Sequence, residues 1–337
     1  MGIVKGGLHI MKETELREFY KQRGSSSAQA DDAVQAVKEL ESFAAACGYE
    51  LPALDVTTLR KYISSLIASG SNTPERLLAL ARYAYLADLL DAYVYLAGVL
   101  GGPEVIASLA ERTEALAGAQ VRSRVFDAVA VPPLGSEQAE YPAATQTIVQ
   151  RLQASLPPDL CRRILAGNHH RIPESSHSVL AEKYRQEGLD AVIEYRHQTL
   201  LADLEAHAAS GKPWYEQIIT PEVVEMVRRN PEIQAGVRRG DTIFVAKIPY
   251  SPVKYLGTSD PTLKRYYQCH CPLARASIIG EGPRVSPLFC YCSGGYEKLP
   301  YDVVFGEPTE VEVLKSALAG DEICRFAIKI PEGKSPA

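Results

Sequence analysis

Two Cys-x-Cys pairs restrict the fold of this chain most strongly, because they require two separate segments to present sulfur atoms in the same way. The pairs are Cys269-His270-Cys271 and Cys290-Tyr291-Cys292, with eighteen residues between them. Side chains two apart on an extended strand point to one face, so His270 and Tyr291 would point away from the sulfurs. Eighteen residues allow a turn and a return. The sequence therefore predicts two neighbouring strands that bring four sulfurs together.

Four convergent thiolates match the tetrahedral ligand set that zinc prefers, and this favours zinc over an iron–sulfur cluster. A site with three cysteines and an open position for water or substrate is an alternative. His270 would replace one sulfur only if its strand is distorted. Two other interpretations stay open: the cysteines are reactive thiols, or they are small buried hydrophobes in the core of a sheet.

Charge and cysteine content limit the compartment and the partners. The N-terminal sequence MGIVKGGLHIMKETELREFY lacks the apolar stretch of a signal peptide, and seven cysteines in a cytoplasmic protein predict free thiols rather than stable disulfides. A net charge of -5 does not indicate a general surface for polyanions.

The apolar stretch 83–100 contains Asp88 and Asp91, so we expect a buried helix there and no membrane span. The expected partner is a small molecule, with neither nucleic acid nor membrane involved.

Periodicity divides the chain into three parts and predicts an α+β fold. Residues 12–118 have the apolar spacing of an all-α helical bundle, which would serve for association with a partner or a second copy in a homodimer. Residues 119–142 contain VAVPPLGSEQAEYPAA and are predicted to be a linker. Residues 143–331 are predicted to begin with helices and to end in a mainly antiparallel sheet. The predicted strands are DTIFVAKIPY, the two cysteine segments, TEVEVLKSAL and EICRFAIKIP, the last two joined by a tight hairpin at Gly320-Asp321.

Further candidate residues lie outside the cysteine pairs. Cys161 precedes His169 and His170, and a Cys/His combination can form an activated nucleophile, although histidines in loops are usually solvated. Arg275 and Arg284, in the loop between the cysteine pairs, can receive a carboxylate, although ordinary solvation of each arginine is the simpler interpretation. Tyrosines near the thiolates suit a flat ligand, although aromatic residues in strands more often belong to the core. The ligand-binding candidates are Tyr267, Arg275, Tyr291 and Tyr296. Cys324 is assigned to core packing, because it alternates with Phe326 and Ile328.

The helices in VTTLRKYISSLIASGSNTPERLLALARYAYLADLL resemble the N-terminal core-binding, SAM-like domain of phage integrases. The Arg…His-x-x-Arg…Tyr set of those recombinases is not evident downstream, so only the helical module is implied. The module leaves a DNA-associated accessory role as an alternative, with contacts from Arg60, Lys61, Arg76 and Arg82. Solvated basic residues on an interaction bundle are the simpler interpretation.

The C-terminal segment TEVEVLKSALAGDEICRFAIKIP resembles the end of the 4-vinyl reductase family and of the related 2-amino-thiazoline-4-carboxylate hydrolase group. The longer run from YYQCHCPLARASI is similar to an allied bacterial family of unassigned function. This resemblance implies an α+β domain with an apolar pocket and a cysteine-ligated zinc. Two functions follow: binding of a small molecule beside the metal, or hydrolysis of a small C–N or C–S heterocycle by zinc-bound water or a cysteine. The matching residues are Glu312, Gly320, Asp321, Cys324 and Phe326.

Overall fold

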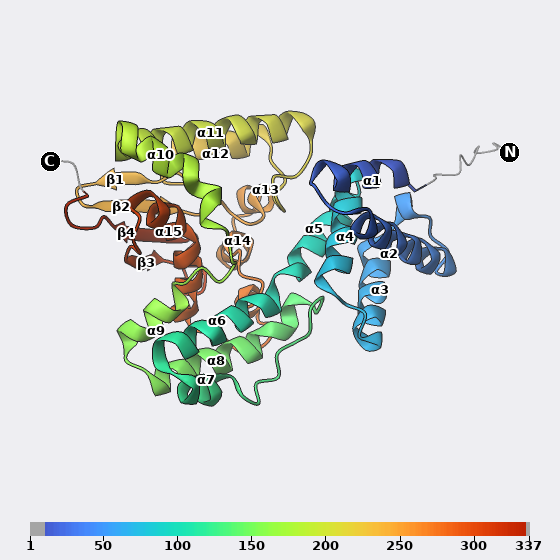
Figure 1. Cartoon of the computed structure of the whole chain (residues 1–337), viewed down its shortest axis with the longest axis horizontal. Coiled ribbons are helices and arrows are strands. Elements are labelled where there is room, and N and C mark those ends of the chain that lie inside the picture. Colours follow the sequence, from blue (N-terminus) through green and yellow to red (C-terminus); the bar gives the residue numbers. More distant parts are fainter. Residues whose placement is uncertain (1–10, 335–337) are drawn as a thin grey trace. The chain divides into compact units, whose positions relative to one another are not determined.

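The computed structural model describes residues 11–334, and it consists of two compact units (Figure 1). The first unit runs to Leu100 and also includes Pro133–Glu137, and the second comprises Gly101–Pro132 and the chain from Gln138 onward. The fold is α+β, as predicted, with a helical N-terminal part and one small antiparallel sheet.

The first unit is a helical bundle whose helix ends match the capping residues in the sequence. Asp55 accepts a hydrogen bond from the Thr58 amide, and Thr73 from the Arg76 amide with Pro74 in the first turn. Gly70 ends a helix in the left-handed conformation. The helices are α1 Glu13–Gln22, α2 Ser27–Ala46, α3 Val56–Ser69, α4 Pro74–Leu86 and α5 Leu90–Leu100.

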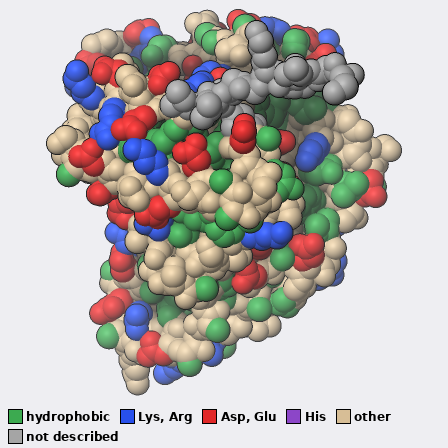
Figure 2. Space-filling view, turned by 90° about the vertical axis from the view of Figure 1, so that its right-hand side faces the viewer, with side chains coloured by type: hydrophobic (Ala, Val, Ile, Leu, Met, Phe, Trp, Pro, Cys, Tyr) green, Lys and Arg blue, Asp and Glu red, His purple; other side chains and the backbone are tan. Residues whose placement is uncertain are grey.

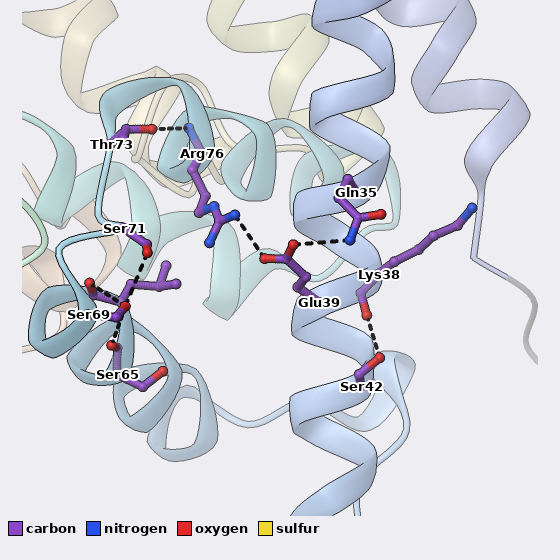
Figure 3. Close-up of polar contacts among 10 residues, drawn as sticks. Gln35, Lys38, Glu39, Ser42, Ser65, Ser69, Ser71, Thr73 and Arg76 are labelled. Atoms are coloured by element: carbon purple, nitrogen blue, oxygen red, sulfur yellow. Dashed lines mark hydrogen bonds and ion pairs between the residues drawn. The ribbon is translucent and has the colours of Figure 1, made fainter.

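Polar contacts join the helices of this bundle around an apolar core. Arg76 of α4 lies 2.9 Å from Glu39 of α2, and the side-chain amide of Gln35 donates to the same carboxylate (Figure 3). Beneath these contacts Val37, Leu59 and Leu77 are fully buried. The predicted periodicity of the bundle is confirmed.

The second unit begins earlier than predicted. Helix α6, Gly102–Ala117, was assigned to the N-terminal bundle, and α7, Ala119–Phe126, lies in the predicted linker. Both assignments were wrong, because Leu109 and Val125 are buried in one core with Ile148. The remaining helices are α8 Tyr141–Ser155, α9 Pro158–Leu165, α10 Ser178–Glu187, α11 Leu189–Ser210, α12 Pro221–Arg229, α13 Pro252–Leu256, α14 Pro261–Gln268 and α15 Tyr291–Phe305.

The sheet has four antiparallel strands in the order β1-β2-β4-β3. Strand β4 is central and pairs Phe326 with Val245 of β2 and with Val313 of β3. Phe326 and Ile328 are fully buried, as the predicted alternation requires. The link between β3 and β4 is the loop 316–324 rather than a tight hairpin. The strands are β1 Val237–Arg239, β2 Thr242–Ala246, β3 Val311–Lys315 and β4 Arg325–Lys329.

The prediction that both cysteine segments are strands was wrong. The segment RYYQCHC is the end of α14 followed by a turn, because Asp260 caps that helix and Pro261 starts it. The segment PLFCYCS is a short 3-10 helix, Pro287–Cys290, that runs directly into α15. Local capping outweighs the β-propensity of the tyrosines and the phenylalanine.

One helical stretch among the described residues, Leu90–Ala117, is long and apolar enough to cross a membrane by those two criteria alone. The stretch comprises α5 and α6. Leu96 packs in the core of the first unit and Leu109 in a core of the second. Packing of this kind is typical of core helices in soluble proteins, so the stretch is weak evidence for a membrane span.

Glu232 forms an ion pair that stabilises the central strand. Its carboxylate lies 2.6 Å from Arg325 Nε in β4 and 2.9 Å from Arg239. The hydrogen bond from Arg325 lowers the pKa of Glu232 against the opposing effect of burial. The ionised carboxylate is therefore more stable in the folded chain than in the unfolded chain.

We expect Glu232→Gln to destabilise the protein by about 2 kcal/mol at neutral pH. Because the pKa is lowered on folding, the pair stabilises the fold above the ordinary carboxyl pKa of about 4.3, and this contribution disappears as the pH falls through the lowered value. Urea denaturation of both proteins, at neutral pH and at about pH 3, measures the difference. An equal cost at both pH values would contradict this assignment.

Candidate functional site

Five cysteines surround one small enclosed cavity in the second unit. The cavity has a volume of about 20 Å³. This is roughly the space needed for one water molecule. Its lining also includes Lys247, His270 and Phe289. The five cysteines are Cys269, Cys271, Cys290, Cys292 and Cys324.

Three separate elements bring the sulfurs to the cavity. Cys269 is the C-cap residue of α14, and Cys271 lies in the turn that follows. Cys290 is the N-cap residue of α15, and Cys292 lies in its first turn. Cys324 directly precedes β4. Both predicted pairs thus line the same cavity, and helix ends and a turn bring them there instead of paired strands.

Helix α15 reaches this position because Gly294 and Gly295 have no side chains. A Cβ atom on Gly295 would lie only 2.5 Å from the Gly167 carbonyl oxygen, and one on Gly294 would lie 3.2 Å from Val311. Only glycine permits such a close backbone approach. The start of α15 is therefore held between α9 and the sheet, with Cys290 and Cys292 at the cavity.

Burial makes the isolated thiolates unfavourable. Burial raises the pKa of Cys271 well above its ordinary value, and the neighbouring sulfurs of Cys269, Cys292 and Cys290 raise it further. Burial also raises the pKa of Cys269, while Arg275, Lys247 and Arg265 oppose that rise. Burial therefore favours the neutral thiol over the thiolate at both cysteines. Thiolates at this place require a compensating positive charge.

The cysteines do not already stand in a finished coordination geometry. Within residues 11–334, no three His, Cys, Asp or Glu side chains are placed to hold a metal ion as they stand. His270 lines the cavity, and its Nε2 donates to the Ile248 carbonyl at 2.6 Å, which leaves Nδ1 as its free ring nitrogen.

A buried ion pair stands beside the thiols. Lys247 Nζ lies 3.4 Å from Glu297 Oε1, and the two side chains are 7% and 2% exposed. Glu297 Oε1 has no partner with hydrogen-bond geometry. The Lys247 ammonium also faces the Tyr296 ring at 4.9 Å. Burial raises the pKa of Glu297, and Lys247 opposes that rise. Such costly buried charges cluster at functional sites.

Arg275 is the predicted ligand-binding residue with the most unusual surroundings. Its guanidinium lies between the rings of Tyr250 at 4.1 Å and Tyr266 at 4.8 Å, and it donates to Gln138 at 2.6 Å. Arg275 is only 8% exposed, and its Nε has no partner. A buried guanidinium with an unused donor can accept a carboxylate.

The three predicted tyrosines do not share one place. Tyr296 is half-exposed and contacts Lys247 and His170. Tyr291 faces a surface groove, although its neighbours Cys290 and Cys292 line the cavity. Tyr267 packs edge-on against Tyr266 and lines neither space. Only Tyr296 therefore lies with the buried charges.

The catalytic candidates are not arranged as a nucleophile and its base. Cys161 is fully buried, and its thiol donates to the Leu152 carbonyl at 3.4 Å. Both ring nitrogens of His169 have other partners, the Ile164 carbonyl and the Ser108 hydroxyl. Burial lowers the pKa of His169 to about 4. His170 is exposed and packs edge-on against Tyr296 at 5.5 Å.

Three residues of the site were missed by the sequence argument. Cys324 is buried with Phe326, as its alternation predicts, but it also lines the cavity. Lys247 follows a strand, and Glu297 lies inside a helix. Neither position carries a local signal for burial of a charge. The ion pair becomes evident only in the tertiary structure, where Lys247 and Glu297 lie in contact.

The basic residues proposed for DNA contact are largely engaged within the first unit. Arg60 pairs with Glu137 at 3.1 Å, Arg76 with Glu39, and the Arg82 guanidinium lies 4.9 Å from the Tyr20 ring. Figure 2 shows basic and acidic side chains interspersed on one face of the molecule. These local contacts favour a structural role for the basic residues.

The fold and the site describe an α+β protein with a cysteine-lined internal cavity. No family model, curated protein or solved structure matches this chain.

We expect Glu297→Ala to destabilise the protein by about 3 to 5 kcal/mol, because it leaves Lys247 buried without its partner. The double variant Lys247→Met with Glu297→Leu removes both charges and should lie within about 1 kcal/mol of the original protein. Chemical denaturation monitored by circular dichroism gives the free energy of unfolding of the original protein and of both variants.

The exposed pair Lys183–Glu187 on α10 is the control, and Glu187→Ala should cost less than about 0.5 kcal/mol. A double variant as unstable as Glu297→Ala would refute the coupling of Lys247 to Glu297.

Proposed function

We propose that the protein binds one soft metal ion, zinc before others, in the five-cysteine cavity. The observation that carries this proposal is the convergence of five thiols on one enclosed space of about 20 Å³. Thiolate ligands select zinc, copper(I) or iron–sulfur clusters. A space for one water-sized sphere suits a single ion and is too small for a cluster of several iron and sulfur atoms.

The surroundings of the cavity supply charge compensation for such a site. Four thiolates around a divalent cation carry two net negative charges. Lys247 and Arg275 are buried nearby, and their positive charges act on Cys269. Cys290 and Cys292 lie at the N-terminus of α15, where the helix dipole favours negative charge. Both effects stabilise a thiolate set with a net negative charge.

Cys269, Cys271, Cys290 and Cys292 are the proposed ligands, and Cys324 is a fifth thiol at the same cavity. A bound zinc ion would supply structural cross-linking, or Lewis-acid polarisation if one ligand position stays open. The seven cysteines of the chain are all free, which agrees with a reducing compartment. We therefore propose a cytoplasmic location, which the free cysteines support.

A small acidic molecule is the proposed partner beside the metal. Arg275 offers an unused buried donor, and Tyr296 gives a half-exposed aromatic surface above Lys247. The hairpin Trp214–Gln217 holds the exposed Tyr215 at a φ of 51°, a conformation that is costly for a bulky residue. Burial raises the pKa of the Tyr296 phenol, and the Lys247, Glu297, Tyr215 and Glu216 groups also act on it. The strained backbone at Tyr215 and the perturbed groups around Tyr296 support the proposal of a ligand site here.

Hydrolysis of a small heterocycle is the second candidate function. Its supporting observation is Lys247, which lines the thiol cavity and also contacts the Tyr296 ring. The Lys247 ammonium contacts both the thiol cavity and the proposed ligand side, and it can donate a proton to a bound substrate. This candidate does not use Cys161, whose thiol is enclosed in the core.

Purified protein supplied with zinc should contain one zinc ion per chain by elemental analysis. Single serine substitutions at Cys269, Cys271, Cys290 or Cys292 should weaken zinc binding by about 100-fold or more, because they remove a first ligand. Chelation should lower the denaturation midpoint of the original protein. A competition assay with a zinc-binding dye measures the affinities.

Cys47→Ser and Cys161→Ser are matched controls, because neither cysteine lines the cavity. Both variants should keep one zinc ion per chain. Metal-free protein after zinc supplementation, with the cavity thiols still reactive in the unfolded chain, would overturn the metal proposal. Zinc loss in Cys324→Ser as well would show that the fifth thiol is also a ligand.

A further inference from the structure

A second hollow lies on the surface of the second unit and does not depend on the metal site. This groove has a volume of about 980 Å³. Its size lies at the upper end of the range for small-molecule sites, about 300 to 1,000 Å³. Side chains from α6, α9, α15 and the sheet line it, including Arg112, Arg163, Tyr291, Glu310 and Glu312.

Arg112 and Arg163 form a like-charged pair in this groove. Arg112 Nε donates to the Arg163 backbone carbonyl at 3.2 Å, so the two residues are held in contact. Partial burial lowers the pKa of Arg112, and the positive charge of Arg163 lowers it further. Gly167 makes room for this arrangement, since a Cβ there would lie 2.6 Å from Arg112 Cδ. The side chain of Arg112 is therefore held against the backbone of Arg163, and the charge of Arg163 is close enough to act on it.

No carboxylate in residues 11–334 pairs with either arginine, which distinguishes them from the other basic residues of the groove. Asp302, whose charge acts on Arg112, is bound by Lys298. The remaining basic residues are also paired: Arg162 with Asp159, and Lys329 with Asp241. The uncompensated positive charge of the groove is thus concentrated at Arg112 and Arg163.

The other residues that line the groove restrict which chemical groups a bound anion can carry in addition to its negative charge. Tyr291 lines the same groove as Arg112 and Arg163, and the Arg162 guanidinium lies 5.9 Å from the centroid of its ring. Glu310 and Glu312, next to and within β3, form no ion pair in the described chain. Their negative charges accept hydrogen bonds from amino or hydroxyl groups and repel an extended polyanion. The two positive charges of the unpaired arginines and the two negative charges of the unpaired glutamates cancel in the net charge of the groove.

We propose that this groove binds a phosphate monoester of a flat-ring compound, of the nucleoside monophosphate class. Arg112 and Arg163 hold the phosphate through bidentate hydrogen bonds, which guanidinium geometry favours. The ring stacks on Tyr291, and its amino or sugar hydroxyl groups donate to Glu310 and Glu312. A nucleic acid strand is disfavoured because the two glutamates repel its further phosphates.

Isothermal titration with AMP, adenosine, inorganic phosphate and benzoate tests this assignment on the full chain. We expect AMP to bind with a Kd below about 1 mM, adenosine to bind at least tenfold more weakly, and inorganic phosphate to compete with AMP. Arg112→Gln and Arg163→Gln should each weaken AMP binding about tenfold, which corresponds to about 1.4 kcal/mol. Tyr291→Leu should weaken AMP binding while inorganic phosphate binds as before.

Arg228→Gln is the matched control, because Arg228 is an exposed arginine of α12 outside the groove. Its AMP affinity should equal that of the original protein, and denaturation curves verify that every variant is folded. Equal affinity for AMP and adenosine, or unchanged AMP binding in the Arg112→Gln, Arg163→Gln double variant, would overturn the proposal. Tighter binding of benzoate than of AMP would overturn it too, because the anion would then be a carboxylate. None of these outcomes depends on whether the protein binds zinc, so this test and the test of the metal proposal can fail separately.

Discussion

The close approach of helix α15 to its neighbours is the constraint on which the site depends. Gly294 and Gly295 let the helix backbone touch β3 on one side and the segment after α9 on the other. The first turns then place Cys290 and Cys292 at the cavity, Tyr291 at the groove and Glu297 against Lys247. One helix therefore contributes to the cavity, the groove and the buried ion pair, and a shift of its start would change all three together.

Burial and charge act against each other at this site. Neutral thiols are stable in the cavity, whereas thiolates without a counter-charge are not. Lys247 and Glu297 are buried at a cost that a pair of apolar residues would avoid. Retention of such a pair next to five thiols is the strongest physical argument that the region serves chemistry as well as packing. The adjacent Arg275, with its unused donor, extends the argument toward a ligand.

Local signals in the sequence predicted much of the architecture. Capping residues such as Asp55 and Thr73 located helix starts, and alternation in EICRFAIKIP identified the buried face of β4. The same reasoning failed for the cysteine segments, because tyrosine and phenylalanine suggested strands where Asp260 and the prolines begin helices. It also placed α6 in the wrong unit, since apolar periodicity does not tell which core a helix joins.

By itself, the sequence determined the α+β class, most helix positions, and the prediction that two cysteine pairs with a short separation lie close together, and all four of these cysteines line one cavity. These properties depend on caps, periodicity and short chain distances, which act within a few residues. Only the tertiary structure decided that Cys324 completes the cavity, that Lys247 meets Glu297, and that Arg112 lies unpaired beside Arg163. Those contacts join segments far apart in the chain, so they depend on how helices and strands pack and leave no local signal.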